Sequence, residues 1–223
     1  MLWVGQFGMV DGEAREESPW VGVFPDSGRA EDPSDLYLLV EPALPGSEDF
    51  CAEMKDAIGA LFHKRKVSLT GGILGALRSA HENLRDWNRK SMKDSRVAAG
   101  VACLAVQGQG AYLGLVGPSA AAIATNGSLH TLRPTLPDAL EPLGLFDDFY
   151  PDFSRIPLDD AARVLLLSPS LLAELPPEEL GAAMRLPPED ALPALYRHAR
   201  RLPNCGAILL AATPDPPEQQ PAV

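Results

Sequence analysis

The sequence has few of the residues that hold zinc or form disulfide frameworks. Three cysteines and four histidines occur among its 223 residues. Cys51, Cys103 and Cys205 are far apart and form no CxxC pair, and no two histidines have the HxxxH spacing. These patterns argue against a zinc site and a disulfide scaffold, and they predict three buried, reduced thiols.

Positive charge is also scarce. Lysine and arginine number 19 against 30 acidic residues, which gives a net charge of -11. Such a surface repels a nucleic-acid backbone, so we expect no nucleic-acid partner. We interpret the basic residues at 63–66 and 85–93 as helix ends, where cations interact favourably with the helix dipole.

Long apolar runs and targeting signals are missing as well. No stretch approaches the run of about 18 apolar residues that a membrane span requires. Residues 1–12 have neither the basic start nor the apolar segment of a signal peptide. We therefore expect no membrane association and a cytoplasmic location.

The sequence is rich in apolar residues, which make up 46% of it and suffice for one domain over residues 1–212. Helical spacing predicts a helix that begins after Ser47, a second from Ser68 to about Lys90, and two or three more with Pro177 and Pro188 in first turns. Short apolar runs predict strands at residues 2–10, 19–24, 36–42, 162–168 and 205–212.

Four further apolar segments between residues 97 and 134 are separated by tight turns. Gly108-Gln109-Gly110 and Asn126-Gly127 are typical of hairpins, so we expect an antiparallel meander. The proline-rich stretch that follows predicts a connection in which Asp147, Asp148 and Asp152 face water while Phe and Tyr residues pack on the core. A docking loop for a partner is the alternative. Residues 213–223 predict a disordered tail.

The order of these elements favours an α+β domain in which antiparallel sheets are covered by helices. It resembles the metal-dependent serine/threonine protein phosphatases of type 2C (the PPM family) across residues 1–212. The resemblance implies a four-layer αββα sandwich: two antiparallel sheets packed face to face and flanked by helix pairs.

Two motifs of that family have changed at their acidic positions. The strand that ends in Asp-Gly resembles "LYLLVEP", where Glu41 takes the place of the aspartate and Pro42 that of the glycine. The Gly-Asp-Ser-Arg turn resembles "LVGPSAAAI", in which Gly117 and Ser119 are kept and Pro118 replaces the aspartate.

Two later motifs show the same change. The Ser-Asp-Gly-Leu turn resembles "LSPSLL", where Ser168 is kept and Pro169 and Ser170 replace Asp-Gly. The closing Asp-Asn pair resembles "PNCG", with Pro203 for the aspartate and Asn204 kept.

Near the N-terminus, the family's Arg-x-x-Asn-Glu-Asp resembles "GEAREES". Glu16 and Glu17 match the acids, while Gly12 stands at the position of the phosphate-binding arginine.

The resemblance therefore implies a phosphatase fold without its metals. Mg²⁺ and Mn²⁺ require oxygen ligands, and proline offers no side-chain ligand. We predict no metal, no cofactor and no catalytic residue, and a regulatory domain that binds a protein partner such as a phosphoprotein or a kinase. The oligomeric state stays open. The expected binding residues lie at the degenerate cleft: Glu16, Glu17, Glu41, Gly117, Pro118, Ser119, Ser168, Pro169, Ser170 and Asn204.

Two other functions stay open from the sequence. The first is an active phosphatase whose metal site has been rebuilt from Glu16, Glu17, Glu41 or the Asp147-Asp148 pair. The second is a structural subunit with an unrelated α+β fold.

Overall fold

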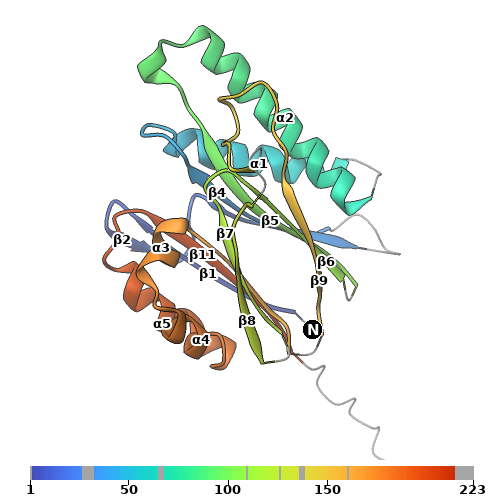
Figure 1. The fold of residues 1–223 in the computed structure, drawn as a ribbon, viewed down its shortest axis with the longest axis vertical. Coiled ribbons are helices and arrows are strands. Elements are labelled where there is room, and N and C mark those ends of the chain that lie inside the picture. The colour runs from blue at the N-terminus through green and yellow to red at the C-terminus, as the bar shows by residue number, and fades with distance from the viewer. Residues whose placement is uncertain are drawn as a thin grey trace, which may run out of the picture.

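A computed structural model describes residues 2–26, 33–64, 68–108, 110–125, 127–135, 139–159 and 161–213. Within these residues the chain forms four layers, with two antiparallel sheets in the middle and helices on both outer sides (Figure 1). This is the αββα sandwich that the family resemblance implies.

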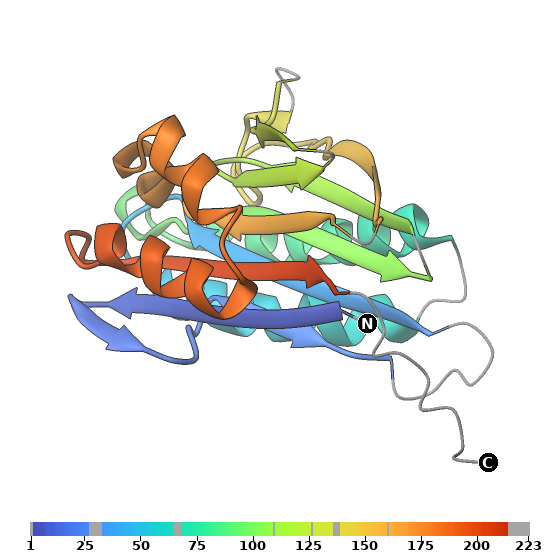
Figure 2. The same ribbon diagram turned by 90° about the horizontal axis from the view of Figure 1, so that it is seen from below.

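The first sheet lies between the second sheet and the three C-terminal helices. Figure 2 shows its strands β1, β11 and β10 side by side. Among the described residues its spatial order is β2 (Glu13–Arg15), β1 (Leu2–Val10), β11 (Cys205–Ala212), β10 (Arg163–Leu167), β7 (Ala120–Thr125) and β8 (Ser128–Leu132).

The second sheet carries the two long helices on its outer face. Among the described residues its spatial order is β3 (Val21–Phe24), β4 (Ser34–Pro42), β5 (Ala99–Gln107), β6 (Gly110–Val116) and β9 (Asp152–Pro157). The helices on it are α1 (Glu48–Lys64) and α2 (Leu69–Lys90), and a short 3-10 turn, η1 (Lys93–Ser95), follows.

Three short helices, rather than a pair, cover the first sheet. They are α3 (Pro169–Glu174), α4 (Pro177–Ala183) and α5 (Pro188–Ala199). Each begins with a proline in its first turn, as predicted at Pro177 and Pro188.

The central strands are mostly apolar because both of their faces are buried. In β10, Val164 and Leu166 belong to the core shared with the second sheet, while Leu165 and Leu167 belong to the core under α3–α5. A strand that is buried on both faces reads as a continuous apolar run, which is why the sequence located it.

The prediction of a four-strand meander is wrong. Strand β6 pairs with β5 and β9 in the second sheet, whereas β7 pairs with β10 and β8 in the first. Residues 117–119 therefore carry the chain from one sheet to the other. A glycine-containing turn looks the same in sequence whether it reverses a hairpin or changes sheets.

The prediction for the proline-rich connection is wrong in part. It contains strand β9, which completes the edge of the second sheet beside β6. Phe149 is buried as expected, but Phe146 and Tyr150 are exposed. Asp147 and Asp148 are exposed as expected, although Asp147 binds Arg85, whereas Asp152 is half-buried and accepts hydrogen bonds from Thr135.

The structure also bears on the predictions for the cysteines, the Ser68 cap and membrane spans. All three cysteines are buried and unpaired, and Ser68 caps α2 by accepting a hydrogen bond from the Gly71 N–H. In the described part of the chain no helix has both the length and the apolar character to cross a bilayer. The predictions for residues 65–66, Gln109, Asn126 and 214–223 lie outside the described residues.

Candidate functional site

Most of the motif turns meet at one end of the sandwich, called the turn end below. Strand β10 ends at Leu167, which pairs with Ala120 at the start of β7 and with Ala207 near the start of β11. In the second sheet, Glu41 near the end of β4 pairs with Gly100 near the start of β5. At the turn end of each sheet, the end of one strand therefore lies beside the start of its antiparallel neighbour.

Glu41 and Ser168 join the two sheets at the turn end. The Ser168 hydroxyl donates a hydrogen bond to Oε1 of Glu41 and accepts one from the Gly206 N–H at 2.7 Å. The Ser168 N–H in turn donates to the Gly206 carbonyl at 3.0 Å. The acid and the serine that the sequence singled out therefore bind each other.

Burial controls the protonation of Glu41. Desolvation raises the pKa of its carboxyl group from 4.5 to about 7, and the Ser168 hydrogen bond opposes part of this rise. Burial, followed by the nearby Glu41 charge, also raises the pKa of the Cys51 thiol and brings that of Cys205 to about 11. Both thiols therefore stay protonated, so neither is an activated nucleophile.

The turn Gly117-Pro118-Ser119 packs directly on strand β5. A Cβ atom built at Gly100 would lie 2.2 Å from the Pro118 carbonyl oxygen. Gly117 has φ +64°, and Ser119 is buried. Pro118 is therefore held against β5 through its backbone, close to the strand position that pairs with Glu41.

The closing turn is tied to the N-terminal hairpin. Oδ1 of Asn204 accepts a hydrogen bond from the Asp11 N–H at 2.9 Å, and the Gly12 N–H donates to the Pro203 carbonyl at 2.8 Å. Asp11 adopts φ +53°, which is uncommon for a residue with a side chain. Asn204 thus has a structural role at the turn end.

Other predicted residues lie apart from the Glu41–Ser168 pair. Glu16 and Glu17 are exposed, and Glu16 lines a groove of about 630 Å³ that Tyr196 of α5 also lines. Pro169 opens α3, and Ser170 in its first turn is exposed. The structure therefore brings together Glu41, Ser168 and the turn at Gly117, but it leaves Glu16 beside a helix on the outer face.

Comparison with known proteins was made by sequence and by structure. Neither the scan against protein-family models nor the search of curated proteins returned a match. A serine/threonine phosphatase of S. agalactiae has a TM-score of 0.78 at 13% identity, covering 95% of this chain and 100% of that one. Stp1 from Staphylococcus aureus has a TM-score of 0.78 at 15% identity, covering 96% of each chain. This chain has the type 2C phosphatase fold.

A third structure with this fold contains metal ions. The catalytic domain of the phosphatase PstP was solved in complex with two manganese ions; its TM-score is 0.70 at 13% identity, covering 96% of this chain and 100% of that one. In the described part of the present chain, no three His, Cys, Asp or Glu side chains lie close enough together to hold a metal.

The turn end does not fit a pair of divalent cations. Such ions require several oxygen ligands, usually carboxylates. Pro118, Pro169 and Pro203 supply none, and the Glu41 carboxyl group is half-buried and already bonded to Ser168. We therefore derive no metal-dependent step for this phosphatase fold.

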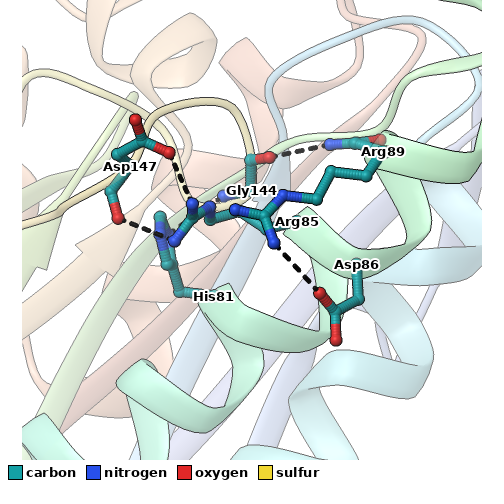
Figure 3. Close-up of polar contacts among 7 residues, drawn as sticks. His81, Arg85, Asp86, Arg89, Gly144 and Asp147 are labelled. Atoms are coloured by element: carbon teal, nitrogen blue, oxygen red, sulfur yellow. Dashed lines mark hydrogen bonds and ion pairs between the residues drawn. The ribbon is translucent and has the colours of Figure 1, made fainter.

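A polar cluster around the buried Asn88 on α2 was not predicted from the sequence. The buried Asn88 donates to the carbonyls of Val97 at 2.7 Å and Gly144 at 2.8 Å, and it accepts from the Val97 N–H at 2.8 Å. The Gly144 N–H donates to Nδ1 of His81, and Arg85 binds Asp147 (Figure 3). The signal in the sequence was Asn88, a polar residue at a position that the helical spacing of the apolar residues predicts to be buried.

We expect Asn88→Ala to lower the free energy of unfolding by about 1–2 kcal/mol, because it leaves buried backbone groups without partners. Asn83→Ala is the matched control, since Asn83 is exposed on the same helix, and it should change stability by less than about 0.5 kcal/mol. Urea unfolding followed by circular dichroism measures both. Equal effects of the two variants would show that Asn88 does not hold the segments together.

Proposed function

We propose that this chain is a catalytically inactive phosphatase-like domain that works as a protein-binding or regulatory module. One observation carries the proposal: Glu41, the acid that stands at the first motif aspartate, is half-buried and hydrogen-bonded to Ser168 across the two sheets. Burial disfavours the ionised form of this carboxyl group, and only the ionised form is a good metal ligand.

Chemistry supports the loss of hydrolysis. A two-metal phosphatase uses its ions to generate a nucleophilic hydroxide and to neutralise the phosphoryl oxygens. Glu41 alone cannot hold two ions, and both neighbouring thiols have raised pKa values. These residues therefore do not support a two-metal route of hydrolysis.

The prolines support a binding role. Proline in a compatible turn lowers the entropy of the unfolded chain and stiffens the folded one. Removal of aspartates also removes carboxylates that would repel each other without metal. A protein partner, such as a phosphoprotein or a kinase, would meet exposed residues like Ser170 rather than the buried Ser119 and Ser168.

We expect the purified chain to release no nitrophenol from p-nitrophenyl phosphate above the buffer rate in millimolar Mn²⁺ or Mg²⁺. Calorimetry with Mn²⁺ should show no saturable heat, because the ligands for a metal pair are missing. Measured activity together with a stoichiometric isotherm, both abolished by Glu41→Gln, would instead establish a rebuilt metal site and overturn the proposal.

A further inference from the structure

Three arginines converge on a small pocket beside the C-terminal half of α2. Arg85 and Arg89 are four residues apart on the helix and so lie on the same face. Arg96 comes from the segment that follows η1, and Asn88 holds the next residue, Val97, against the helix. The pocket measures about 150 Å³ and is lined by the three arginines together with Asn88, Gly144 and Asp147.

The positive charge of this pocket is incompletely neutralised. Arg96 makes no hydrogen bond or ion pair with the described part of the chain, and Arg89 reaches only Asp86, at 3.8 Å. Arg85 binds Asp147, whose side chain is 91% exposed. Three guanidinium groups thus face one carboxylate of the pocket, in a protein whose net charge is -11.

Arg85 stays in place even without the Asp147 carboxylate. Its Nη1 donates to the backbone carbonyl of Asp147 at 2.9 Å, while its Nη2 donates to the carboxylate (Figure 3). Gly144 fixes the loop, since its N–H donates to His81 and its carbonyl accepts from Asn88. The Asp147 carboxylate can therefore leave without collapse of the pocket.

Helix-end electrostatics explain only part of this arrangement. The negative end of the α2 dipole favours cations in its last turn, which accounts for Arg89 and Lys90. It does not account for Arg96, which lies beyond the helix and is brought back to it by the Asn88 hydrogen bonds. Convergent arginines match the oxygens of a phosphoryl group, which they can bind in a forked geometry.

A neighbouring pocket is less suited to an anion. It lies on the same loop and is lined by Arg78 and Arg85, but also by Glu82, Asp147 and Asp148. Its carboxylates outnumber its arginines, so an anion would be repelled there. Arginines outnumber carboxylates only in the pocket of Arg85, Arg89 and Arg96, so of these two pockets it is the one suited to an anion.

We propose that the pocket of Arg85, Arg89 and Arg96 binds a phosphorylated residue of a partner protein, with the phosphoryl group displacing the Asp147 carboxylate from Arg85. Phe146 and Tyr150, exposed on the loop that carries Asp147, offer apolar contacts to the flanking peptide. The net negative charge disfavours nucleic acid. The inference rests on the proposed partner-binding function and assigns it a surface away from the turn end.

Fluorescence polarisation on the full chain tests this inference with a labelled random-sequence peptide library that carries one central phosphothreonine. The unphosphorylated library should bind at least about tenfold more weakly, since charge-assisted hydrogen bonds are worth about 1.5–3 kcal/mol. Arg96→Gln should weaken binding by about tenfold for the same reason. Asp147→Asn should strengthen it by up to about fivefold, because an exposed competing ion pair is removed.

Arg200→Gln is the matched control, because Arg200 is exposed just after α5 on the opposite side of the sandwich and the net charge changes equally. It should leave binding unchanged. Equal binding of both libraries, equal effects of Arg96→Gln and Arg200→Gln, or tighter binding of a single-stranded oligonucleotide would overturn the inference. Hydrolysis of the phosphopeptides in Mn²⁺ would overturn the proposed function instead. The opposite sign expected for Asp147→Asn separates binding effects from misfolding.

Discussion

Gly100→Ala should destabilise the chain by about 3 kcal/mol or more, because the new methyl group has no room. The Cβ atom would lie 2.2 Å from the Pro118 carbonyl oxygen and 2.7 Å from its carbonyl carbon. Both are backbone atoms, so no side-chain rotation relieves the clash. The turn at residues 117–119, which carries the chain between the two sheets, must move as a whole.

Gly110→Ala provides the control for this prediction. Gly110 begins β6 in the same sheet, and the nearest atom to its added Cβ would be the Gln107 carbonyl oxygen at 3.8 Å. We expect a change of less than about 1 kcal/mol there, in the stabilising direction if the backbone is compatible. Chemical unfolding followed by Trp fluorescence measures both variants. If Gly100→Ala were as stable as Gly110→Ala, Pro118 would not be packed on β5.

The strands buried on both faces could be predicted from the sequence because local composition determines them. The expected run at 205–212 coincides with β11, and the expected run at 162–168 contains β10. Strand β9 was missed because it is an edge strand with only Ile156 fully buried, so it has little apolar signal. Its position depends on pairing with β6, which is a long-range contact.

Long-range contacts also limit what the sequence reveals of the candidate site. Motif order placed Glu41 and Ser168 at related turns, but their hydrogen bond spans 127 positions of the chain and two sheets. The sequence gives no reason to single out Arg96, because its proximity to Arg85 depends on the buried hydrogen bonds of Asn88. Such contacts depend on tertiary packing, so they cannot be predicted from short sequence motifs or from the spacing of apolar residues.

The stability of the chain should fall by about 2–3 kcal/mol as the pH rises from 4.5 to 7, owing to the titration of Glu41. Its pKa in the folded state, about 7, lies above its ordinary value of 4.5. In this window the folded chain keeps a proton that the unfolded chain releases. The free energy of unfolding therefore decreases as the pH rises, and the loss is complete above the folded pKa.

Glu41→Gln isolates this contribution from that of the other titrating groups. Glutamine keeps a carbonyl oxygen that can accept the Ser168 hydrogen bond, but it carries no charge to desolvate. The variant should match the native chain near pH 4 and exceed its stability by about 2–3 kcal/mol at pH 8. Urea unfolding at a series of pH values measures the difference between the two curves.

Ser168→Ala changes the same curve in the opposite sense. It removes the donor that favours the ionised carboxylate, so the pKa of Glu41 should rise further and the loss of stability should extend to higher pH. It also leaves the buried Gly206 N–H without its 2.7 Å partner, which lowers stability at every pH. If the native, Glu41→Gln and Ser168→Ala curves ran parallel, the Glu41 carboxyl group would be solvated and free to bind a cation, and the proposed loss of catalysis would need another cause.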